Sequence, residues 1–439
     1  MKLPGHIEEY ENKYAFRGIF PVSSELGRIE QVVVIPALAE KDSLFATLSG
    51  LSRNSQTELG RTLILCVINN RGNHIASPEV ISNNRDTIAY LSLPIKGETG
   101  DFAGDEGSVG HLRELCKNPL RLAFIDASSP GREMPDRSGG VGAARKMGMD
   151  AALRLFDYTI AGRKLLFSLD ADTIVRNNYL EAVRSFFLHE RAEAAVVAYV
   201  HQRPATSRSR LAISTYEIFL RYYAIGLRYA GSPYSFHTIG STMICTADAY
   251  VAVGGMNRRD GAEDFYFLNK LAKFTSVGRI STTAVYPSAR PSWRVPFGTG
   301  RHVTRFLEGG GDEFLLYDPR VFLVLKKWLA LMKSSLAMDP EEILALAGKI
   351  EPQLFSYLKM NQFFGTWQSI RKNTKQYEGL RRQFHFWFDG FKTMKLIRFL
   401  TDRGFPKIDM FEALAGLLHM QQSEGSLNSK ESDSYPFVS

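Results

Sequence analysis

The sequence predicts an α/β layer fold followed by a helical extension, and two observations support this. Residues 31–285 alternate between short apolar runs and helical patterns, which is typical of chains that fold as successive strand–helix–strand units. Residues 319–420 contain several helical patterns and few strand signals. We therefore expect a sheet covered by helices, with a helical unit after it.

Composition and charge narrow the class of protein. The 439 residues include 54 Lys and Arg against 46 Asp and Glu, so the formal net charge is +8. Apolar residues make up 44% and charged residues 23%, which excludes a disordered chain, a collagen-like fibre and a small disulfide scaffold. Three cysteines without a CxxC pair argue against a disulfide framework or a cysteine zinc site, and favour a reducing compartment.

Membrane insertion is not expected from this sequence. No run approaches the roughly 18 apolar residues that span a bilayer, and the first residues lack the apolar core of a signal peptide. We expect a soluble, cytoplasmic protein that rests at most on the inner face of a membrane.

Apolar runs and helical spacing define the predicted elements. A strand over residues 31–35 is stopped by Pro36, and Leu44, Leu48 and Leu51 mark a helix after it. A polar stretch over residues 96–110, rich in glycine and acids, predicts a surface loop or insertion. The predicted strands cover residues 31–35, 62–68, 121–125, 165–169, 194–200 and 242–245, and the predicted helices cover residues 40–51, 141–155, 177–188 and 265–274, with another from 246.

The chain divides into four predicted segments. These are an N-terminal segment (1–30), the α/β domain (31–305), a basic helical extension (306–422) and a disordered tail (423–439). In the extension, Asp339 followed by Pro340 predicts a helix that begins there, with Asp as the N-cap.

A basic and aromatic stretch lies within the extension. Residues 364–403 carry nine Lys and Arg and three Asp and Glu, and Phe384, Phe388 and Phe391 follow helical spacing with Trp387 beside them. This aromatic stripe, formed by the three phenylalanines and Trp387, predicts a helix that packs its aromatic rings on neighbouring helices. The alternative is an amphipathic surface that rests on anionic lipid. Nucleic-acid binding is not expected, because no recognised fold motif accompanies the charge.

Two aspartates follow the strand predicted over residues 165–169. Asp170 and Asp172 project to the same side of an extended backbone, so both can converge on one cation. They lie where a strand ends, which is where ligands of open α/β sheets bind. Two carboxylates suit Mg²⁺ or Mn²⁺, with phosphate oxygens and water completing the coordination. The alternative is an ordinary polar turn.

A second acidic pair opens the helix predicted over residues 265–274. Glu263 and Asp264 come after a turn that contains Gly254 and Gly255. Acids in a first helical turn complement the helix dipole, which is one interpretation. The other is that Asp264 faces the first carboxylate pair and acts as a general base on a hydroxyl.

Glycine-rich segments on either side of these motifs carry positive charge. Residues 139–146 read GGVGAARK, a loop entering a helix whose N-terminus favours anions, with Arg145 adding charge. Residues 292–302 suit a lid over a diphosphate, with Arg294 and Arg301 as phosphate contacts. The alternative for this second segment is a linker in which His302 is merely solvated.

These elements, in this order, resemble the family 2 glycosyltransferases with the GT-A fold, from about residue 32 to about residue 300. The resemblance implies a mixed, mostly parallel sheet flanked by helices. It places Pro36 and Glu40 near the nucleotide base, and Asn69 where the family usually has an aspartate. Gly142, Ala144, Arg145 and Gly148 match a GxxxARNxG helix, with Lys146 replacing the usual asparagine.

The resemblance also implies a reaction and a set of site residues. The expected reaction is metal-dependent, inverting transfer of a single sugar from a nucleotide-diphosphate sugar to an acceptor hydroxyl. The acceptor would be a glycan, a lipid-linked molecule or a small molecule. The expected roles are catalysis by Asp264 and Glu263, donor binding by Pro36, Glu40, Asn69, Gly142, Arg145, Asp170 and Arg301, and Mn²⁺ or Mg²⁺ binding by Asp172, Asp170 and His302.

Departures from the family pattern leave alternatives open. Asn69 can both donate and accept hydrogen bonds, so the nucleotide base stays unspecified. The extension lacks the membrane spans and the QxxRW-type motif of processive members, which favours single transfer. A retaining transferase on the same fold is one alternative. A non-catalytic nucleotide-sugar-binding protein is another, with Asn69 and Lys146 as signs of a degenerate site.

Overall fold

The computed structural model describes residues 3–17, 21–23, 27–72, 74–96, 106–292, 298–309 and 312–425. Its contacts divide the chain into two units. Unit 1 comprises Met1–Ser214 and Phe236–Gly309, and unit 2 comprises Thr215–Ser235 and Gly310–Ser439.

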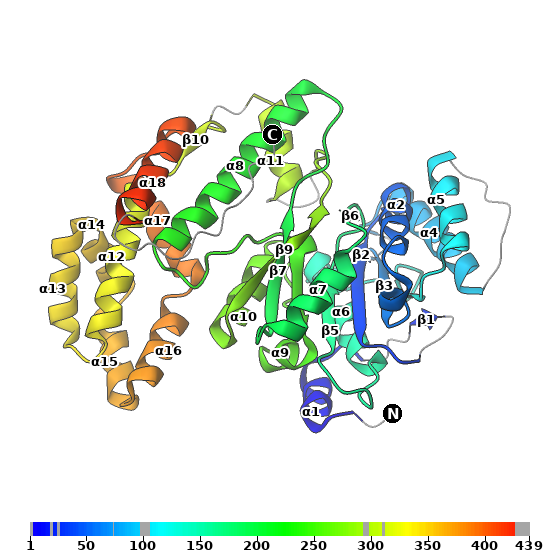
Figure 1. The fold of residues 1–439 in the computed structure, drawn as a ribbon, viewed down its shortest axis with the longest axis horizontal. Helices are drawn as coiled ribbons and strands as arrows, with labels where there is room; N and C mark the ends of the chain where they lie inside the picture. The colour runs from blue at the N-terminus through cyan, green and yellow to red at the C-terminus, as the bar shows by residue number, and fades with distance from the viewer. Residues whose placement is uncertain are drawn as a thin grey trace. The chain divides into compact units, whose positions relative to one another are not determined.

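Among the described residues, nine strands of unit 1 form one mixed sheet in the order β1-β4-β3-β2-β5-β8-β7-β9-β6 (Figure 1). β2 pairs in parallel with β3 and β5, β3 with β4, and β7 with β9, whereas β1, β6 and β8 pair antiparallel. The predicted α/β class with a mixed, mostly parallel sheet is confirmed. The strands are β1 (Val22–Ser23), β2 (Gln31–Ala37), β3 (Thr62–Asn69), β4 (Leu122–Ala127), β5 (Leu165–Ser168), β6 (Ile174–Val175), β7 (Ala194–Tyr199), β8 (Met243–Thr246) and β9 (Val277–Tyr286).

The central strands are buried along their whole length, which explains their continuous apolar sequences. Pro36 belongs to β2 rather than stopping it. Val34 accepts a hydrogen bond from the Leu169 N–H on the β5 side, and β5 pairs with β2 no further than Val34. Because backbone directions alternate along a strand, the nitrogen of Pro36 points to the same side, beyond the β5 ladder. Its missing N–H therefore breaks no bond of the sheet.

Helices of unit 1 pack on this sheet. Helix α6 contacts β2 and β3, and Gly148 allows this close approach, because a Cβ there would overlap with Val34 and Val67. The bounds of α6 are those predicted. The helices are α1 (Gly5–Tyr14), α2 (Lys41–Ser52), α3 (Gln56–Leu59), α4 (Pro78–Lys96), α5 (Glu106–Lys117), α6 (Val141–Leu155), α7 (Tyr179–His189), α9 (Ala247–Ala252), α10 (Glu263–Phe274) and α11 (Thr299–Leu307), and α8 (Ser207–Tyr229) belongs to both units.

The loop predicted over residues 96–110 is only partly described. Residue 96 ends α4, a helix that the sequence did not predict, and residues 106–110 form the start of α5. Residues 97–105 lie outside the described residues. The prediction is therefore wrong for the part that can be compared, because this part of the stretch is helical.

A buried ionic cluster joins three helices of unit 1. Lys146 of α6 donates to the Tyr10 hydroxyl at 2.7 Å and pairs with Asp150 at 3.0 Å. Tyr10 of α1 and Tyr250 of α9 each donate to Asp150 Oδ1 at 2.8 Å. Burial lowers the pKa of Lys146, and the charge of Asp150 opposes that shift. Lys146 in place of the family's asparagine is thus part of a compensated buried pair.

We predict that Asp150→Asn costs about 3–5 kcal/mol of unfolding free energy, because it leaves the Lys146 ammonium buried without an anion. Chemical unfolding measures the loss. The double variant Lys146→Met with Asp150→Asn should recover part of it, since no charge then stays buried. A loss below about 1 kcal/mol in the single variant would contradict the role given to this pair.

Unit 2 is largely helical. The predicted helix start at Asp339 is confirmed, since its side chain accepts a hydrogen bond from the Glu341 N–H at 2.8 Å. The elements, beside the second part of α8, are α12 (Arg320–Ser335), α13 (Pro340–Ile350), α14 (Pro352–Met360), α15 (Phe363–Asn373), α16 (Tyr377–Trp387), α17 (Gly390–Arg403), α18 (Met410–Gly425) and the paired strands β10 (Leu315–Leu316) and β11 (Ile408–Asp409).

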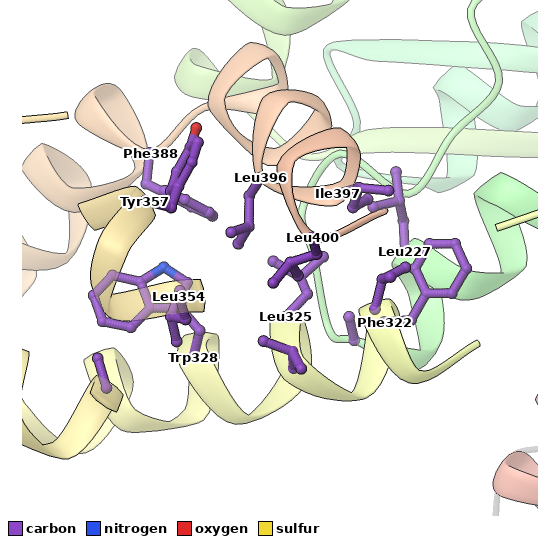
Figure 2. Packing of buried hydrophobic residues seen from close by; sticks show 14 of the residues in the cluster. Leu227, Phe322, Leu325, Trp328, Leu354, Tyr357, Phe388, Leu396, Ile397 and Leu400 are labelled. Carbon is purple, nitrogen blue, oxygen red and sulfur yellow. The ribbon is translucent and has the colours of Figure 1, made fainter. Parts of the chain in front are cut away.

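The aromatic stripe of the extension lies in the core of unit 2. Phe384 and Phe388 are buried, with ring centroids 5.8 and 6.0 Å from that of Trp328. Figure 2 shows Leu396 and Leu400 of α17 on the side that faces Trp328 and its helix α12. The predicted packing is confirmed for Phe384 and Phe388. The prediction of one helix is wrong, because α16 ends at Trp387 and Phe391 belongs to α17.

Two further predictions concern membranes and the chain end. In the described part of the chain, no helix combines the length and the apolar character that crossing a bilayer requires. The predicted tail begins at residue 423, but α18 extends to residue 425, and residues 426–439 lie outside the described residues.

Candidate active site

The carboxyl ends of β2, β3 and β5 bring predicted site residues to one edge of the sheet. β2 is paired with β3 up to Ala37 and Ile68, and with β5 up to Val34 and Ser168. Glu40 therefore follows β2, Asn69 ends β3, and Asp170 and Asp172 follow β5 at the same edge. This is the edge where open α/β sheets bind their ligands.

Arg145 of α6 links the two acidic motifs. Its side chain is only 4% exposed, and its guanidinium contacts Asp170 Oδ1 at 2.6 Å and Glu263 Oε1 at 3.2 Å. It also donates to the Ser168 hydroxyl at 2.9 Å. Gly240 leaves room for this side chain, since a Cβ there would overlap with the guanidinium. Arg145 was predicted to bind the donor; here it holds two carboxylates, and donor contact stays a prediction.

Asp170 is held by hydroxyl groups as well as by Arg145. Ser241, in the 3₁₀ turn Gly240–Thr242, donates to Asp170 Oδ2 at 2.5 Å, and its hydroxyl lies 2.9 Å from that of Thr173. Both oxygens of Asp170 therefore have partners. Sequence reasoning missed Ser241, because no motif marks a serine that lies 71 positions from its partner.

Asp172 lies among charges of both signs. Arg290, four residues after the end of β9, pairs with Asp172 Oδ2 at 3.1 Å and also with the carboxylate of Glu40. Burial, followed by the charges of Asp170 and Glu40, raises the pKa of Asp172 to about 7, although Arg290 opposes the shift. No motif in the sequence marks Arg290, which precedes the predicted lid.

Asp264 lies in the first turn of α10. The turn enters the helix through Ala262 in a left-handed conformation (φ 56°), and the Phe265 N–H donates to Asp264 Oδ1 at 2.7 Å. Burial and the neighbouring charge of Glu263 raise the pKa of Asp264 to about 7. The charge of Asp170 acts on both Asp172 and Asp264, so the two acidic motifs share one electrostatic cluster.

The N-terminus of α6 contacts the loop that leads into Glu263. The Gly142 N–H donates to the Arg259 carbonyl at 3.2 Å, and the Gly140 N–H donates to Asp260 at 3.1 Å. A Cβ at Gly142 would overlap with the carbonyls of Asn257 and Arg259. The glycines thus allow loop and helix to pack closely, and a nucleotide contact at Gly142 stays a prediction.

An asparagine of α4 connects the ends of β2 and β3. Asn84 accepts from the Ala39 N–H at 2.9 Å and donates to the Asn69 carbonyl at 3.1 Å and to Asn70 at 2.9 Å. It supports Ala39 in a left-handed conformation (φ 52°) just before Glu40. Sequence reasoning missed Asn84 together with its helix, while Asn69 itself is buried as the last residue of β3.

The predicted lid and third metal ligand are only partly described. Arg301 and His302 are half-buried residues of α11. Arg294 lies outside the described residues. Within the described residues, no three His, Cys, Asp or Glu side chains are arranged to hold a metal ion. Roles for Arg301 at a phosphate and for His302 at a metal stay predictions.

Comparisons with known proteins give distant structural neighbours. No protein-family model matches the sequence, and no curated protein matches it. The chain is similar to S. aureus TarS 1–349 in complex with UDP-GlcNAc, with 12% identity, a TM-score of 0.38 and coverage of 82% of this chain and 91% of that one. It is also similar to the mannosyltransferase PcManGT from Pyrobaculum calidifontis in complex with GDP-Man and Mn²⁺, with 13% identity, a TM-score of 0.36 and coverage of 97% and 93%. Similarities as weak as these do not identify the function of this chain.

We predict that Arg145→Ala costs about 3–5 kcal/mol of unfolding free energy, because Asp170 and Glu263 lose their buried counter-ion. Arg145→Lys should restore little of this, since one ammonium cannot reproduce the planar fork that reaches three acceptors. Chemical unfolding measures both variants. A matched control is Arg53→Ala, whose side chain is 51% exposed and pairs with Glu114, and which should cost less than about 1 kcal/mol. Equal losses for Arg145→Ala and the control would contradict the assignment.

We predict that Asp264→Asn stabilises the protein above neutral pH. The folded pKa of Asp264, about 7, exceeds its ordinary value of 3.8, so the folded state binds more protons between these values. Stability is therefore lost as the pH rises through this window. The variant should gain about 1–3 kcal/mol at pH 8 and nothing at pH 4. Thermal melting at the two pH values measures this, with the exposed Asp402→Asn as the control that shows no such difference.

Proposed function

We propose that the protein is a glycosyltransferase that moves a single sugar from a nucleotide-diphosphate sugar to an acceptor hydroxyl, with inversion and with a divalent cation. One observation carries the proposal. Arg145 joins Asp170 of the first acidic motif to Glu263 of the second, and so places Asp264 in the same cluster at the carboxyl edge of the sheet.

The carboxylates fit a hard divalent cation. Asp170 and Asp172 supply the oxygen ligands that Mg²⁺ or Mn²⁺ prefers, and phosphate oxygens and water commonly complete such sites. Asp172 suits the cation best, because both oxygens of Asp170 are already hydrogen-bonded. We assign Asp172 as the main ligand, Asp170 as the second and His302 as a further one. A bound cation would offset the negative charge that develops on the diphosphate leaving group.

Asp264 suits the role of general base. An ordinary aspartate is too weak a base to take a proton from a hydroxyl near neutral pH, whereas a carboxylate with a pKa of about 7 is better matched. Glu263 is held by Arg145 and orients the first turn of α10. Asp264 then accepts the acceptor hydroxyl's proton while that oxygen attacks the sugar from the face opposite the diphosphate.

The donor side of the site consists of residues at the ends of β2 and β3. Pro36, Glu40 and Asn69 lie where the base and ribose are expected, and the Asn69 amide leaves the choice of base open. We also propose that the diphosphate is contacted by Gly142, Arg145 and Arg301. The acceptor class stays open among glycans, lipid-linked molecules and small molecules, and contact of the basic helices with a membrane stays a prediction.

Two alternatives can be distinguished from the proposed inverting transferase. In a retaining transferase, Asp264 would position substrate only, and NMR of the product's anomeric proton separates retention from inversion. In a non-catalytic binding protein, Asp172 and Asp264 would have no reason to be kept in surroundings that raise their pKa, since such shifts are typical of functional sites.

We predict opposite kinetic signatures for the two acidic motifs. Asp264→Asn should lower kcat about 10²–10⁴-fold, because the proton acceptor is lost, while donor affinity changes less than about twofold. Asp172→Asn should abolish turnover together with Mn²⁺ binding. Calorimetry with Mn²⁺ and a panel of nucleotide sugars, followed by steady-state kinetics on the donor that binds, measures both. Turnover of Asp264→Asn at the wild-type rate would remove it from the base role, and silence across the panel would favour the binding-protein alternative.

A further inference from the structure

We propose that Arg290 is an exchangeable cation, which occupies the metal side of the site in the ligand-free protein and moves to the donor diphosphate when a divalent ion binds Asp172. The inference rests on the proposed function and concerns a residue to which the family resemblance assigned no role.

Arg290 bridges two carboxylates at the carboxyl edge of the sheet. The same terminal nitrogen, Nη2, contacts the Glu40 carboxylate and lies 3.1 Å from Asp172 Oδ2. These carboxylates follow different strands, β2 and β5, which are neighbours in the sheet. The guanidinium of Arg290 therefore lies close to the position that a divalent ion bound by Asp172 would take. The two cations therefore compete for the same oxygen.

The contrast between Arg290 and Arg145 is the second step. The Arg145 side chain is 4% exposed and has partners on three sides, so its release would bury unpaired charges. The Arg290 side chain is 41% exposed and pairs with the carboxylates of Glu40 and Asp172. Arg145 is thus enclosed, whereas Arg290 is partly exposed and can leave Asp172 when another cation takes its place there.

The charge balance is the third step. Asp172 and Glu40 place two carboxylates at this edge, and the guanidinium of Arg290 pairs with both. A divalent ion at Asp172 carries more positive charge than the guanidinium that it displaces, so the carboxylates stay compensated after the exchange. The released guanidinium can then form paired hydrogen bonds to phosphate oxygens, for which its planar fork is suited.

The exchange predicts that removing the charge of Arg290 has opposite effects on the affinity for Mn²⁺ and on the affinity for pyrophosphate. Arg290→Gln should bind Mn²⁺ alone about tenfold more tightly than the wild type, because the competing cation is gone. The same variant should bind inorganic pyrophosphate in the presence of saturating Mn²⁺ about tenfold more weakly, because a phosphate contact is lost. Electron paramagnetic resonance of free Mn²⁺ and calorimetry with pyrophosphate give the two affinities without any turnover assay.

Matched variants separate the inference from the proposed function. Arg154→Gln is the control, since that side chain is 43% exposed and pairs with the buried Glu11 in the same unit, and it should change neither affinity. Asp172→Asn should abolish Mn²⁺ binding in both backgrounds, and if it does not, the metal site of the proposed function is wrong. Mn²⁺ binding that depends on Asp172 but is unchanged or weaker in Arg290→Gln overturns the exchange alone. Arg290→Lys, which keeps a cation, should restore Mn²⁺ affinity toward the wild type.

Discussion

The buried guanidinium of Arg145 is the interaction on which the site depends. Removing an arginine from water costs several kcal/mol, and only well-placed carboxylates offset that cost. Asp170 and Glu263 do so from two elements that are 93 residues apart in the chain, and the planar guanidinium sets their separation. A shift of α6, of the end of β5 or of α10 would break this geometry. The relative placement of Asp170 and Glu263, and with it that of the two acidic motifs, therefore depends on one side chain.

The surroundings of Asp172 and Asp264 lower the stability of the folded protein while they favour the roles that we propose for these residues. Asp172 and Asp264 are kept in surroundings that raise their pKa, so above neutral pH their charges destabilise the folded state. The buried central strands of the sheet stabilise the folded state and offset this loss, as do loops that are held by side chains such as Asn84. If every carboxylate had a cationic partner, the pKa of Asp264 would fall, and Asp264 would be a weaker base in the role that we propose for it.

The sequence predicts the parts of this structure that depend on local pattern. The apolar runs of β2 and β3 identify buried strands, and the aspartates after β5 stand out because they follow such a strand directly. Arg290 and Ser241 were missed because their roles come from contacts across 118 and 71 positions, which spacing along the chain does not reveal. Helix α4 was missed because it contains residues that disfavour helices, among them Asn83 and Pro94, although Asn84 on it supports the turn before Glu40.

Helix α6 shows why one departure from the family pattern need not indicate a degenerate site. Successive residues of a helix point about 100° apart, so neighbours in sequence serve different surroundings. Arg145 faces the acidic motifs, whereas Lys146 contacts Tyr10 of α1 and Gly148 meets β2 and β3. Lys146 is thus explained by its buried pair with Asp150 and not by a contact with the acidic motifs. Asn69 is then the departure left at the site, and in the proposed function it concerns the choice of nucleotide base rather than the transfer of the sugar.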